Sequence, residues 1–230
     1  MIDLFPEGFE EIERADGVEL VAYTDPGGEE RLWKVFGHTS GSEVPEGWEG
    51  RWRQFHRPVR VGELWIGQPW QKQPSDAIAV VIDPGRAFGT GAHPTTRLCL
   101  ELLAKLPRAS VLDVGCGSGV LAIAASKLGF APVTAVDSDE NAVEATRRNA
   151  EANGVSLCVQ RSDAQADDLP DANVAIVNVT RAVVEASAGQ LRWPRLVSSG
   201  YLVSEPAVLD GYRHVERTAE DGWAADLFER

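Results

Sequence analysis

The sequence has few cysteines, fewer basic than acidic residues, and no long apolar segment. Its three cysteines, Cys99, Cys116 and Cys158, are an odd number, lie far apart and show no Cys-x-x-Cys or Cys/His spacing. We therefore expect reduced thiols and no metal site. No apolar run reaches the roughly eighteen residues that a membrane-spanning helix needs, and residues 1–6 lack the basic-then-apolar order of a signal peptide. These absences predict a cytoplasmic protein without membrane attachment.

Acidic residues outnumber basic ones. The 35 Asp and Glu against 22 Lys and Arg give a formal net charge of −13. Because nucleic-acid affinity rests on neutralising phosphates with Lys and Arg, this balance argues against direct nucleic-acid binding and favours a basic protein as partner. With 230 residues and 43% hydrophobic content, the chain can bury the core of one domain plus an appendage.

A glycine-rich segment at 111–119, VLDVGCGSG, is followed about one βα unit later by VTAVD at 133–137. Apolar residues around Asp113 predict a buried parallel strand, and those of 120–128 predict a helix. The glycines would then lie at a strand end, where open α/β sheets bind ligands. Asp137, at the end of the second strand, can accept hydrogen bonds from ribose hydroxyls, and Ser138 beside it joins the expected cofactor-binding residues. The pairing indicates a cofactor that carries a nucleoside.

The spacing of Gly115, Gly117 and Gly119 separates two classes of cofactor. A dinucleotide fold would have G-x-G-x-x-G facing a pyrophosphate. Here Asp113 stands two residues before the first glycine, and its carboxylate would repel a pyrophosphate but suits a cationic amino acid moiety. S-adenosylmethionine (SAM) carries an ammonium and a sulfonium and no phosphate, so the motif predicts SAM. The alternative is a glycine turn with a buried structural Asp.

Strands and helices alternate after Pro84, which predicts an α/β, doubly wound, Rossmann-like parallel sheet. The expected strands cover residues 111–114, 133–137, 157–160, 174–178 and 196–199, and the expected helices cover 95–106, 119–128, 141–153 and 183–191. Helix 141–153 should end at the Asn-Gly pair 153–154. The tail, residues 212–228, has two apolar patches around Glu-Asp-Gly at 220–222, as expected for an antiparallel hairpin that closes the sheet.

The N-terminal part has a different pattern. Alternating segments at 9–14 and 18–23, joined by Ala-Asp-Gly, predict a hairpin, and a helix is expected at 29–36. We divide the chain into an α+β piece at 1–47, a linker and sheet-capping segment at 48–84, and a main domain at 85–230.

Four tryptophans, Trp48, Trp52, Trp65 and Trp70, crowd the linker. They could stack on bases or on a peptide, but no groove of basic residues surrounds them. We therefore interpret them as packing the linker onto the main sheet.

The segment 83–96, DPGRAFGTGAHPTT, carries a resemblance to a known family. Together with the glycine motif, Asn178 and the ending GWAADLF at 222–228, it resembles PrmA, the methyltransferases of large-subunit ribosomal protein eleven, from about residue 55 onward. The resemblance implies a ferredoxin-like substrate-recognition domain, a linker and a class I SAM-dependent methyltransferase domain with a seven-stranded sheet. It also implies methylation of α-amino and lysine ε-amino groups of a ribosomal protein.

The resemblance assigns roles to residues that match its motifs. Phe88 to Gly91 resembles the loop that folds over SAM and the target amine, which makes Phe88 and Thr90 candidate catalytic residues, and Thr90 and Gly91 candidate cofactor contacts. Asp163 resembles the acid that reads the adenine amino group, although a solvated loop Asp is the alternative. His93 has the residue type of a general base. We interpret it instead as a hydrogen-bonding loop residue before a helix cap at residues 95–96.

Asn178 ends a strand where amino-directed methyltransferases have a polar residue beside the reacting nitrogen. It is a candidate for both catalysis and cofactor binding, and a structural Asn capping the next turn is the alternative. Base-directed enzymes continue with Pro-Pro-aromatic, whereas this chain continues with Val-Thr-Arg, which argues against a nucleic-acid base as acceptor. The family typically has Asn-Ile-Leu, so Val179 and Thr180 make the expected pocket slightly more polar.

The N-terminal piece is short for a complete ferredoxin-like domain. The order β-α-β-β-α-β does not fit into about forty-five residues, and the first strand and helix are missing. Three hypotheses follow: a methyltransferase for the ribosomal protein, an enzyme of the same chemistry for another protein or small amine, and a non-catalytic SAM-binding protein. No general base is assigned.

Overall fold

The computed structural model describes residues 10–14, 17–21, 32–37, 39, 57–83, 89, 91–188 and 193–230. The chain forms two compact units, residues 1–55 and 56–230. In the first unit, β1 (Glu10–Arg14) and β2 (Gly17–Val21) pair antiparallel. This confirms the predicted hairpin. Residues 32–36 are helical, whereas residues 29–31 of the helix predicted at 29–36, and also Trp48 and Trp52, lie outside the described residues.

The second unit contains a seven-stranded sheet in the order β11-β12-β10-β9-β6-β7-β8. Its strands are β6 (Val111–Val114), β7 (Val133–Asp137), β8 (Cys158–Arg161), β9 (Val174–Asn178), β10 (Arg195–Leu202), β11 (Arg213–Glu220) and β12 (Trp223–Glu229). β8, β7, β6, β9 and β10 run parallel, and β12 is antiparallel to both β10 and β11. The mostly parallel sheet and the C-terminal hairpin are both confirmed.

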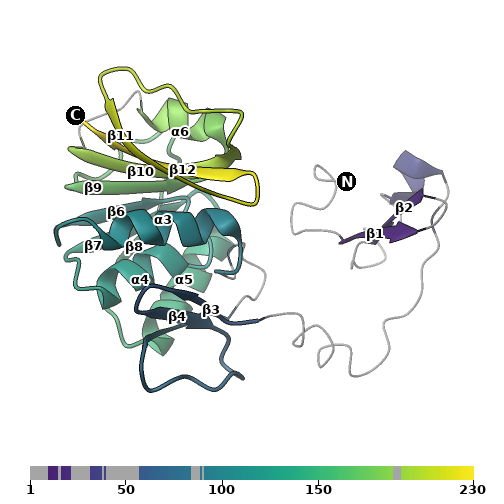
Figure 1. Cartoon of the computed structure of the whole chain (residues 1–230), viewed down its shortest axis with the longest axis horizontal. Helices are drawn as coiled ribbons and strands as arrows, with labels where there is room; N and C mark the ends of the chain where they lie inside the picture. Colours follow the sequence, from purple (N-terminus) through teal and green to yellow (C-terminus); the bar gives the residue numbers. More distant parts are fainter. Residues whose placement is uncertain are drawn as a thin grey trace. The chain divides into compact units, whose positions relative to one another are not determined.

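Helices cover both faces of this sheet (Figure 1). They are α3 (Pro94–Ala104), α4 (Val120–Lys127), α5 (Glu140–Ala152) and α6 (Arg181–Ala188). Successive residues of a strand point to opposite faces. Val111 accordingly packs with the α3 and α4 side and Leu112 with the α6 side. Because β6 is buried on both faces, its sequence is apolar throughout apart from Asp113.

A second, three-stranded sheet was not predicted. β3 (Val59–Val61) pairs antiparallel with β4 (Leu64–Gly67), and β4 pairs parallel with β5 (Ile78–Val81). Its apolar residues join the core on the α3 and α4 side, so part of segment 48–84 is built into the second unit. Trp65, in β4, is buried there.

Several element boundaries differ from the sequence prediction by one to three residues: α6 begins at Arg181 rather than at residue 183, and β8 covers 158–161 rather than 157–160. Two further differences have a clear structural reason. Helix α3 begins at Pro94 and its cap is His93, so the cap predicted at residues 95–96 was wrong. β10 is longer than the predicted 196–199 because a β-bulge between Ser199 and Tyr201 lets the strand continue past Gly200. The predicted end of α5 is confirmed, with Asn153 at its C-cap and Gly154 at φ +65°.

The C-terminal hairpin is tied to helix α3 and to β10. Its turn has Asp221 and Gly222 at positive φ, as a two-residue hairpin turn requires. Arg97 of α3 donates to Glu220 at 2.9 Å beside that turn. Asp226, fully buried, accepts hydrogen bonds from Tyr201 and Arg217. The hairpin is therefore held at its turn and in the middle of its strands.

The described residues contain neither a membrane-spanning helix nor a cluster of metal-ligating side chains. None of the described helices is long and apolar enough to cross a membrane. No group of three or more His, Cys, Asp or Glu residues in the described ranges is arranged to hold a metal ion. Cys99 and Cys116 are buried free thiols, and Cys158 is exposed.

Candidate cofactor and active site

The candidate site lies where the winding of the sheet reverses. From the central strand β6 the chain moves outward through β7 to β8, and it then returns to β9 on the other side of β6. Loops leaving the carboxyl ends of β6 and β9 therefore diverge, and such a switch point is where α/β sheets bind ligands. The glycine turn, residues 115–119, follows β6, and Asn178 is the last residue of β9.

Packing within the protein itself requires glycines in this turn. Gly115, Gly117 and Gly119 all have positive φ. A Cβ on Gly115 would lie 2.4 Å from the Val179 side chain, and one on Gly119 would lie 2.8 Å from Thr146. The turn thus contacts both the acceptor-side loop and helix α5 in a way that only glycine permits.

The two carboxylate oxygens of Asp113 lie in different environments. Its Oδ2 accepts the Ala122 N–H at 3.0 Å in the first turn of α4. The N-cap residue of this helix, Gly119, has no side chain that could accept that hydrogen bond. The Oδ1 of Asp113 is buried and has no hydrogen-bond partner among the described residues. Burial, together with the nearby Asp137 charge, raises the pKa of Asp113 to about 7. One oxygen is structural, and the other suits a cationic ligand group.

Asp137 joins the glycine turn to the start of α5. Its Oδ2 accepts the Gly117 N–H and its Oδ1 accepts the Asp139 N–H, both at 3.0 Å. Each carboxylate oxygen keeps a further lone pair, and the side chain is partly exposed. The carboxylate is therefore held in place with capacity for ribose hydroxyls. Ser138 is exposed, and its carbonyl accepts from Arg161 Nε at 2.9 Å.

Asp163 follows β8 and is exposed. Its Oδ1 accepts the Gln165 N–H at 2.9 Å, and its own N–H donates to Asp167 at 2.8 Å. Asp163 thus closes a local turn. Contact with an adenine amino group remains a prediction for this residue.

Asn178 is half-buried and pairs with Ser199 of β10. Within the described chain no hydrogen bond involves its side chain. The next residue is confined, because a Cβ on Gly200 would lie 1.7 Å from the Val179 carbonyl oxygen. The first turn of α6 uses the Thr180 carbonyl, which accepts from the N–H groups of Val183 and Val184. The backbone that carries Asn178 is thus fixed by Gly115 on one side and Gly200 on the other.

Phe88 and Thr90 lie outside the described residues, but two neighbouring glycines are described. The Ser118 hydroxyl donates to the Gly89 carbonyl. A Cβ on Gly91, which has positive φ, would lie 2.5 Å from the Ile66 side chain of β4. Gly89 therefore lies against the glycine turn, and Gly91 against the three-stranded sheet.

His93 has a structural role. Its Nδ1 accepts the Thr95 N–H at 3.3 Å and lies 2.7 Å from the Thr95 hydroxyl, which caps α3. Its ring packs edge-on against Trp223 of β12 with centroids 4.9 Å apart. Burial, and secondly the charge of Arg97, lower the pKa of His93. These contacts support the interpretation of His93 as a hydrogen-bonding loop residue.

Residues 15–228 match the family described as Ribosomal protein L11 methyltransferase (PrmA). The chain belongs to this family. A PrmA-family relative, the ribosomal protein L11 methyltransferase of Caldanaerobacter subterraneus subsp. tengcongensis, is 36% identical over 208 residues, which are 84% of this chain and 67% of the relative. That of Shewanella sediminis is 46% identical over 138 residues, 57% of this chain and 47% of the relative. The chain therefore spans about half to two thirds of the length of these relatives.

A solved structure agrees with the family assignment. The ribosomal protein L11 methylase of Lactobacillus delbrueckii subsp. bulgaricus superposes with a TM-score of 0.67 at 26% identity, over 76% of this chain and 99% of that one. A tRNA methyltransferase of Pyrococcus abyssi, at 21% identity and a TM-score of 0.54, has a similar fold. The class I methyltransferase architecture predicted from the sequence is thereby confirmed.

The PrmA family implies SAM as cofactor, and the residues at the switch point fit it. The unpartnered buried oxygen of Asp113 is suited to the cationic amino acid moiety. The fixed carboxylate of Asp137 is suited to ribose hydroxyls. Gly117 and its neighbours bring backbone rather than side chains to the ligand side of β6.

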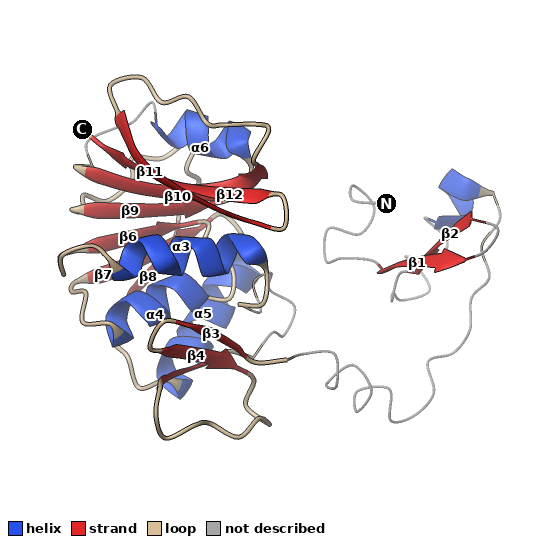
Figure 2. Cartoon of the chain, in the orientation of Figure 1, coloured by secondary structure: helices blue, strands red, loops and turns tan. Residues whose placement is uncertain are grey.

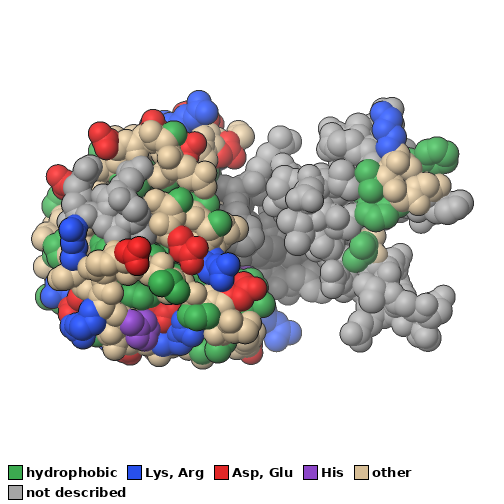
Figure 3. All heavy atoms as spheres, turned by 90° about the horizontal axis from the view of Figure 1, so that it is seen from above, with side chains coloured by type: hydrophobic (Ala, Val, Ile, Leu, Met, Phe, Trp, Pro, Cys, Tyr) green, Lys and Arg blue, Asp and Glu red, His purple; other side chains and the backbone are tan. Residues whose placement is uncertain are grey.

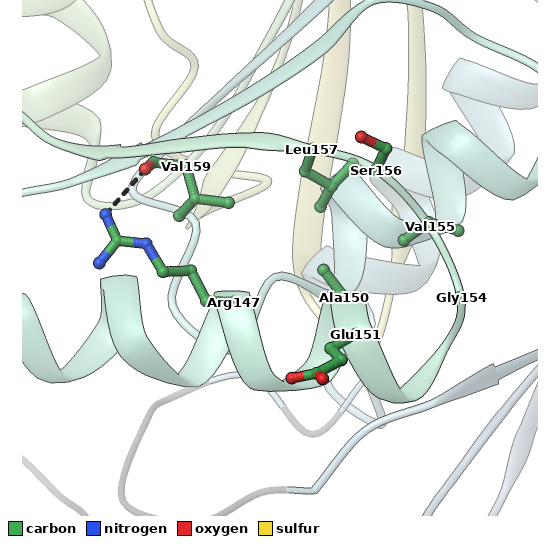
Figure 4. Close-up of a pocket in the computed structure, with 8 residues that line it drawn as sticks. All are labelled: Arg147, Ala150, Glu151, Gly154, Val155, Ser156, Leu157 and Val159. Carbon is green, nitrogen blue, oxygen red and sulfur yellow. Dashed lines mark hydrogen bonds between the residues drawn. The ribbon is translucent and has the colours of Figure 1, made fainter.

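A hollow elsewhere on the second unit does not belong to this site. It measures about 600 Å³ and is lined by the C-terminal half of α5 and the segment leading into β8, with Arg147 donating to the Val159 carbonyl at its rim (Figure 4). This segment enters β8, whereas the candidate site lies at the ends where the parallel strands finish. None of the predicted site residues lines the hollow.

The sequence analysis missed four polar residues that support the site. They are Ser118, which belongs to the glycine turn and donates to the Gly89 carbonyl, and Thr146, Asn149 and Asn153, which contact the glycine turn or the end of β5. Three of them lie in ATRRNAEAN at 145–153, at positions that share one face of a helix. That shared face was the available signal.

Proposed function

We propose that this chain is a SAM-dependent methyltransferase that methylates amino groups of ribosomal protein L11. The observation that carries the proposal is the switch-point arrangement, in which the glycine turn, Asp113 and Asp137 lie on the β6 and β7 side and Asn178 ends β9. The family match over residues 15–228 supports the same reaction and acceptor. We propose lysine ε-amino and N-terminal α-amino groups as the methylated atoms.

The site must align a neutral amine with its methyl donor. SAM, when bound, supplies an electrophilic methyl group on a sulfonium. A lysine amine with a pKa near 10.4 is mostly protonated at neutral pH, so its proton must leave before attack. Asn178 has an amide oxygen that can accept from an amine N–H, and its backbone is fixed by Gly115 and Gly200. Proximity and alignment would supply most of the rate. Loss of the proton to water before entry suffices, and we assign no base.

The charge balance supports a basic protein acceptor. Asp and Glu side chains lie among Lys and Arg on the face in Figure 3, and no continuous basic stripe crosses its described part. With a net charge of −13, long-range attraction would favour a positively charged partner. A cytoplasmic location and a substrate-recognition role for residues 1–47 are part of the same proposal. Phe88, Thr90 and Gly91 complete the proposed site from the loop before α3.

One observation favours a second candidate, an enzyme of the same chemistry that acts on another protein or a small amine. Val179 and Thr180 follow Asn178, at positions where the family resemblance leads us to expect Ile-Leu beside the acceptor. This difference concerns acceptor binding, because both residues follow β9 rather than β6 or β7. A non-catalytic SAM-binding protein would share the cofactor half as well.

Intact-mass analysis of ribosomal protein L11 from the same organism, after incubation with the enzyme and SAM, tests the proposal. We expect increments of methyl size, and we expect Asn178→Ala to reduce their rate by about tenfold or more while still binding SAM. Asp163→Ala removes only an exposed turn contact within the chain. Its affinity for SAM therefore tests separately whether Asp163 binds the adenine amino group. SAM binding without increments on this acceptor would contradict the proposed substrate, and turnover with another amine would favour the second candidate.

A further inference from the structure

Helix α5 has three polar side chains that point into the protein. Thr146, Asn149 and Asn153 are spaced at i, i+3 and i+7, which places them on one face. The exposed fractions of Thr146 and Asn149 are 0% and 3%. Polar groups buried this deeply need hydrogen-bond partners, and these partners are two backbone segments beside the cofactor site.

Thr146 supports the glycine turn directly. Its hydroxyl donates to the Gly117 carbonyl at 3.0 Å and lies 3.3 Å from Cys116 Sγ. Gly119 is in contact with it, because a Cβ there would lie 2.8 Å from its methyl group and 3.0 Å from its hydroxyl. The glycine turn therefore packs directly against the Thr146 side chain.

Asn149 connects the turn to the end of the small sheet. Its Nδ2 donates to the Ser118 carbonyl at 2.9 Å and to the Asp83 carbonyl at 3.3 Å, and its Oδ1 accepts the Asp83 N–H at 3.1 Å. Asn153 makes the same amide pairing with Val81 of β5, at 2.9 and 2.6 Å. The two amides therefore extend β5 as a neighbouring strand would. Of the two, only Asn149 also reaches the glycine turn.

We propose that Thr146 and Asn149 are positioning residues for the cofactor, which they affect through the backbone of the turn. They hold two consecutive carbonyls, those of Gly117 and Ser118, on the α5 side. In a planar trans peptide the N–H points opposite to the carbonyl, so the Ser118 N–H is directed away from α5. The turn is thereby preorganised before a ligand binds, which lowers the cost of binding. This inference rests on the proposed use of SAM and extends it to residues outside the glycine motif.

Isothermal titration of SAM into the full chain, with Asn149→Ala and Asn153→Ala as a matched pair, tests the proposal. Asn153→Ala removes a part-buried amide pairing with Val81 of β5, and Asn149→Ala removes the matching pairing with Asp83, two residues further on, so both should lower the melting temperature. Only Asn149→Ala also frees the Ser118 carbonyl, and we expect it to raise the Kd for SAM about tenfold, whereas Asn153→Ala should leave the Kd within about twofold. Equal Kd values for the two variants would overturn the proposal.

If Asn149→Ala does not fold, a second pair of variants, at Thr146, tests the proposal. Thr146→Val keeps the shape of the side chain and removes the hydroxyl donor, and Thr146→Ser keeps the donor. We expect weaker SAM binding for Thr146→Val and near-normal binding for Thr146→Ser, and the same affinity in both would overturn the role of the hydroxyl. If the wild-type chain binds SAM but does not methylate the ribosomal protein, the proposed acceptor is contradicted and the positioning role of Thr146 and Asn149 is not. A wild-type chain that does not bind SAM removes both proposals.

Discussion

A single buried carboxyl group connects stability with cofactor binding. Asp113 fills the cap position that Gly119 leaves open at α4, and its second oxygen is buried without a partner in the described structure. The sequence showed the residue and its place before the glycines, because the motif is local. It could not show that one oxygen is committed to a helix, because that contact depends on how α4 turns back over β6.

Replacing Asp113 by Asn should change how stability depends on pH. A folded-state pKa of about 7, above the ordinary Asp value, means that the folded protein holds a proton that the unfolded chain has lost between about pH 4 and 7. The free energy of unfolding therefore falls as pH rises through that window, by roughly 1–3 kcal/mol. Asp113→Asn removes this loss, so without cofactor it should unfold at a higher temperature than the wild type at pH 8, and it should bind SAM more weakly.

Thermal unfolding of both proteins without cofactor, from pH 5 to pH 8, measures this effect. The gap between them should widen toward pH 8. Parallel pH profiles would mean that Asp113 does not titrate in this range.

Elements differ in how well their sequences predicted them. The apolar segments of β6, β7 and β9 are bounded by turn residues, and their predicted limits agree with the structure. β3, β4 and β5 were missed because they lie in a segment interrupted by proline and glycine, which we interpreted as a linker. The polar face of α5 was also missed, because polar residues within a helix ordinarily face solvent.

Gly200→Ala should destabilise the fold at the β10 bulge. At φ +101° an alanine is strained, and its Cβ would lie 1.7 Å from the Val179 carbonyl oxygen, so the loop that carries Asn178 must move. We expect a loss of about 3 kcal/mol or more in the free energy of unfolding. Gly129→Ala is the control, because its φ is +91° with nothing within 4 Å of the added Cβ, and it should cost only about 1–2 kcal/mol. Urea denaturation compares the two, and similar costs would show that the contact with Val179 adds nothing.

At the scale of the whole molecule, the described core and the described candidate site lie in the second of the two units. Both apolar clusters of the catalytic fold lie within residues 56–230, and every described candidate site residue lies there too. The glycine motif and segment 83–96 predicted the family, and the net charge of −13 favoured a basic partner, which stays a proposal. The strand order came only from the structure, because the sequence of one strand does not show which distant strand it pairs with.

A chain of residues 56–230 should therefore fold and bind SAM with the Kd of the full chain. If residues 1–55 help to bind the acceptor, the shortened chain should show a KM for ribosomal protein L11 raised about tenfold or more. Titration calorimetry and methylation kinetics measure the two quantities separately. An unchanged KM would indicate that acceptor recognition resides in the second unit.

The reversal of strand order at β6 and β9 also has an evolutionary consequence. The strands that carry the glycine turn and Asp137 lie on one side of that boundary, and β9, β10 and the C-terminal hairpin lie on the other. In the proposed function, the first side would hold the cofactor and the second, with Val179 and Thr180, would face the acceptor, so a change on the second side need not alter cofactor binding. Under this proposal, the choice of amine acceptor can change, in evolution or by engineering, without changes to the half of the sheet that holds the methyl donor.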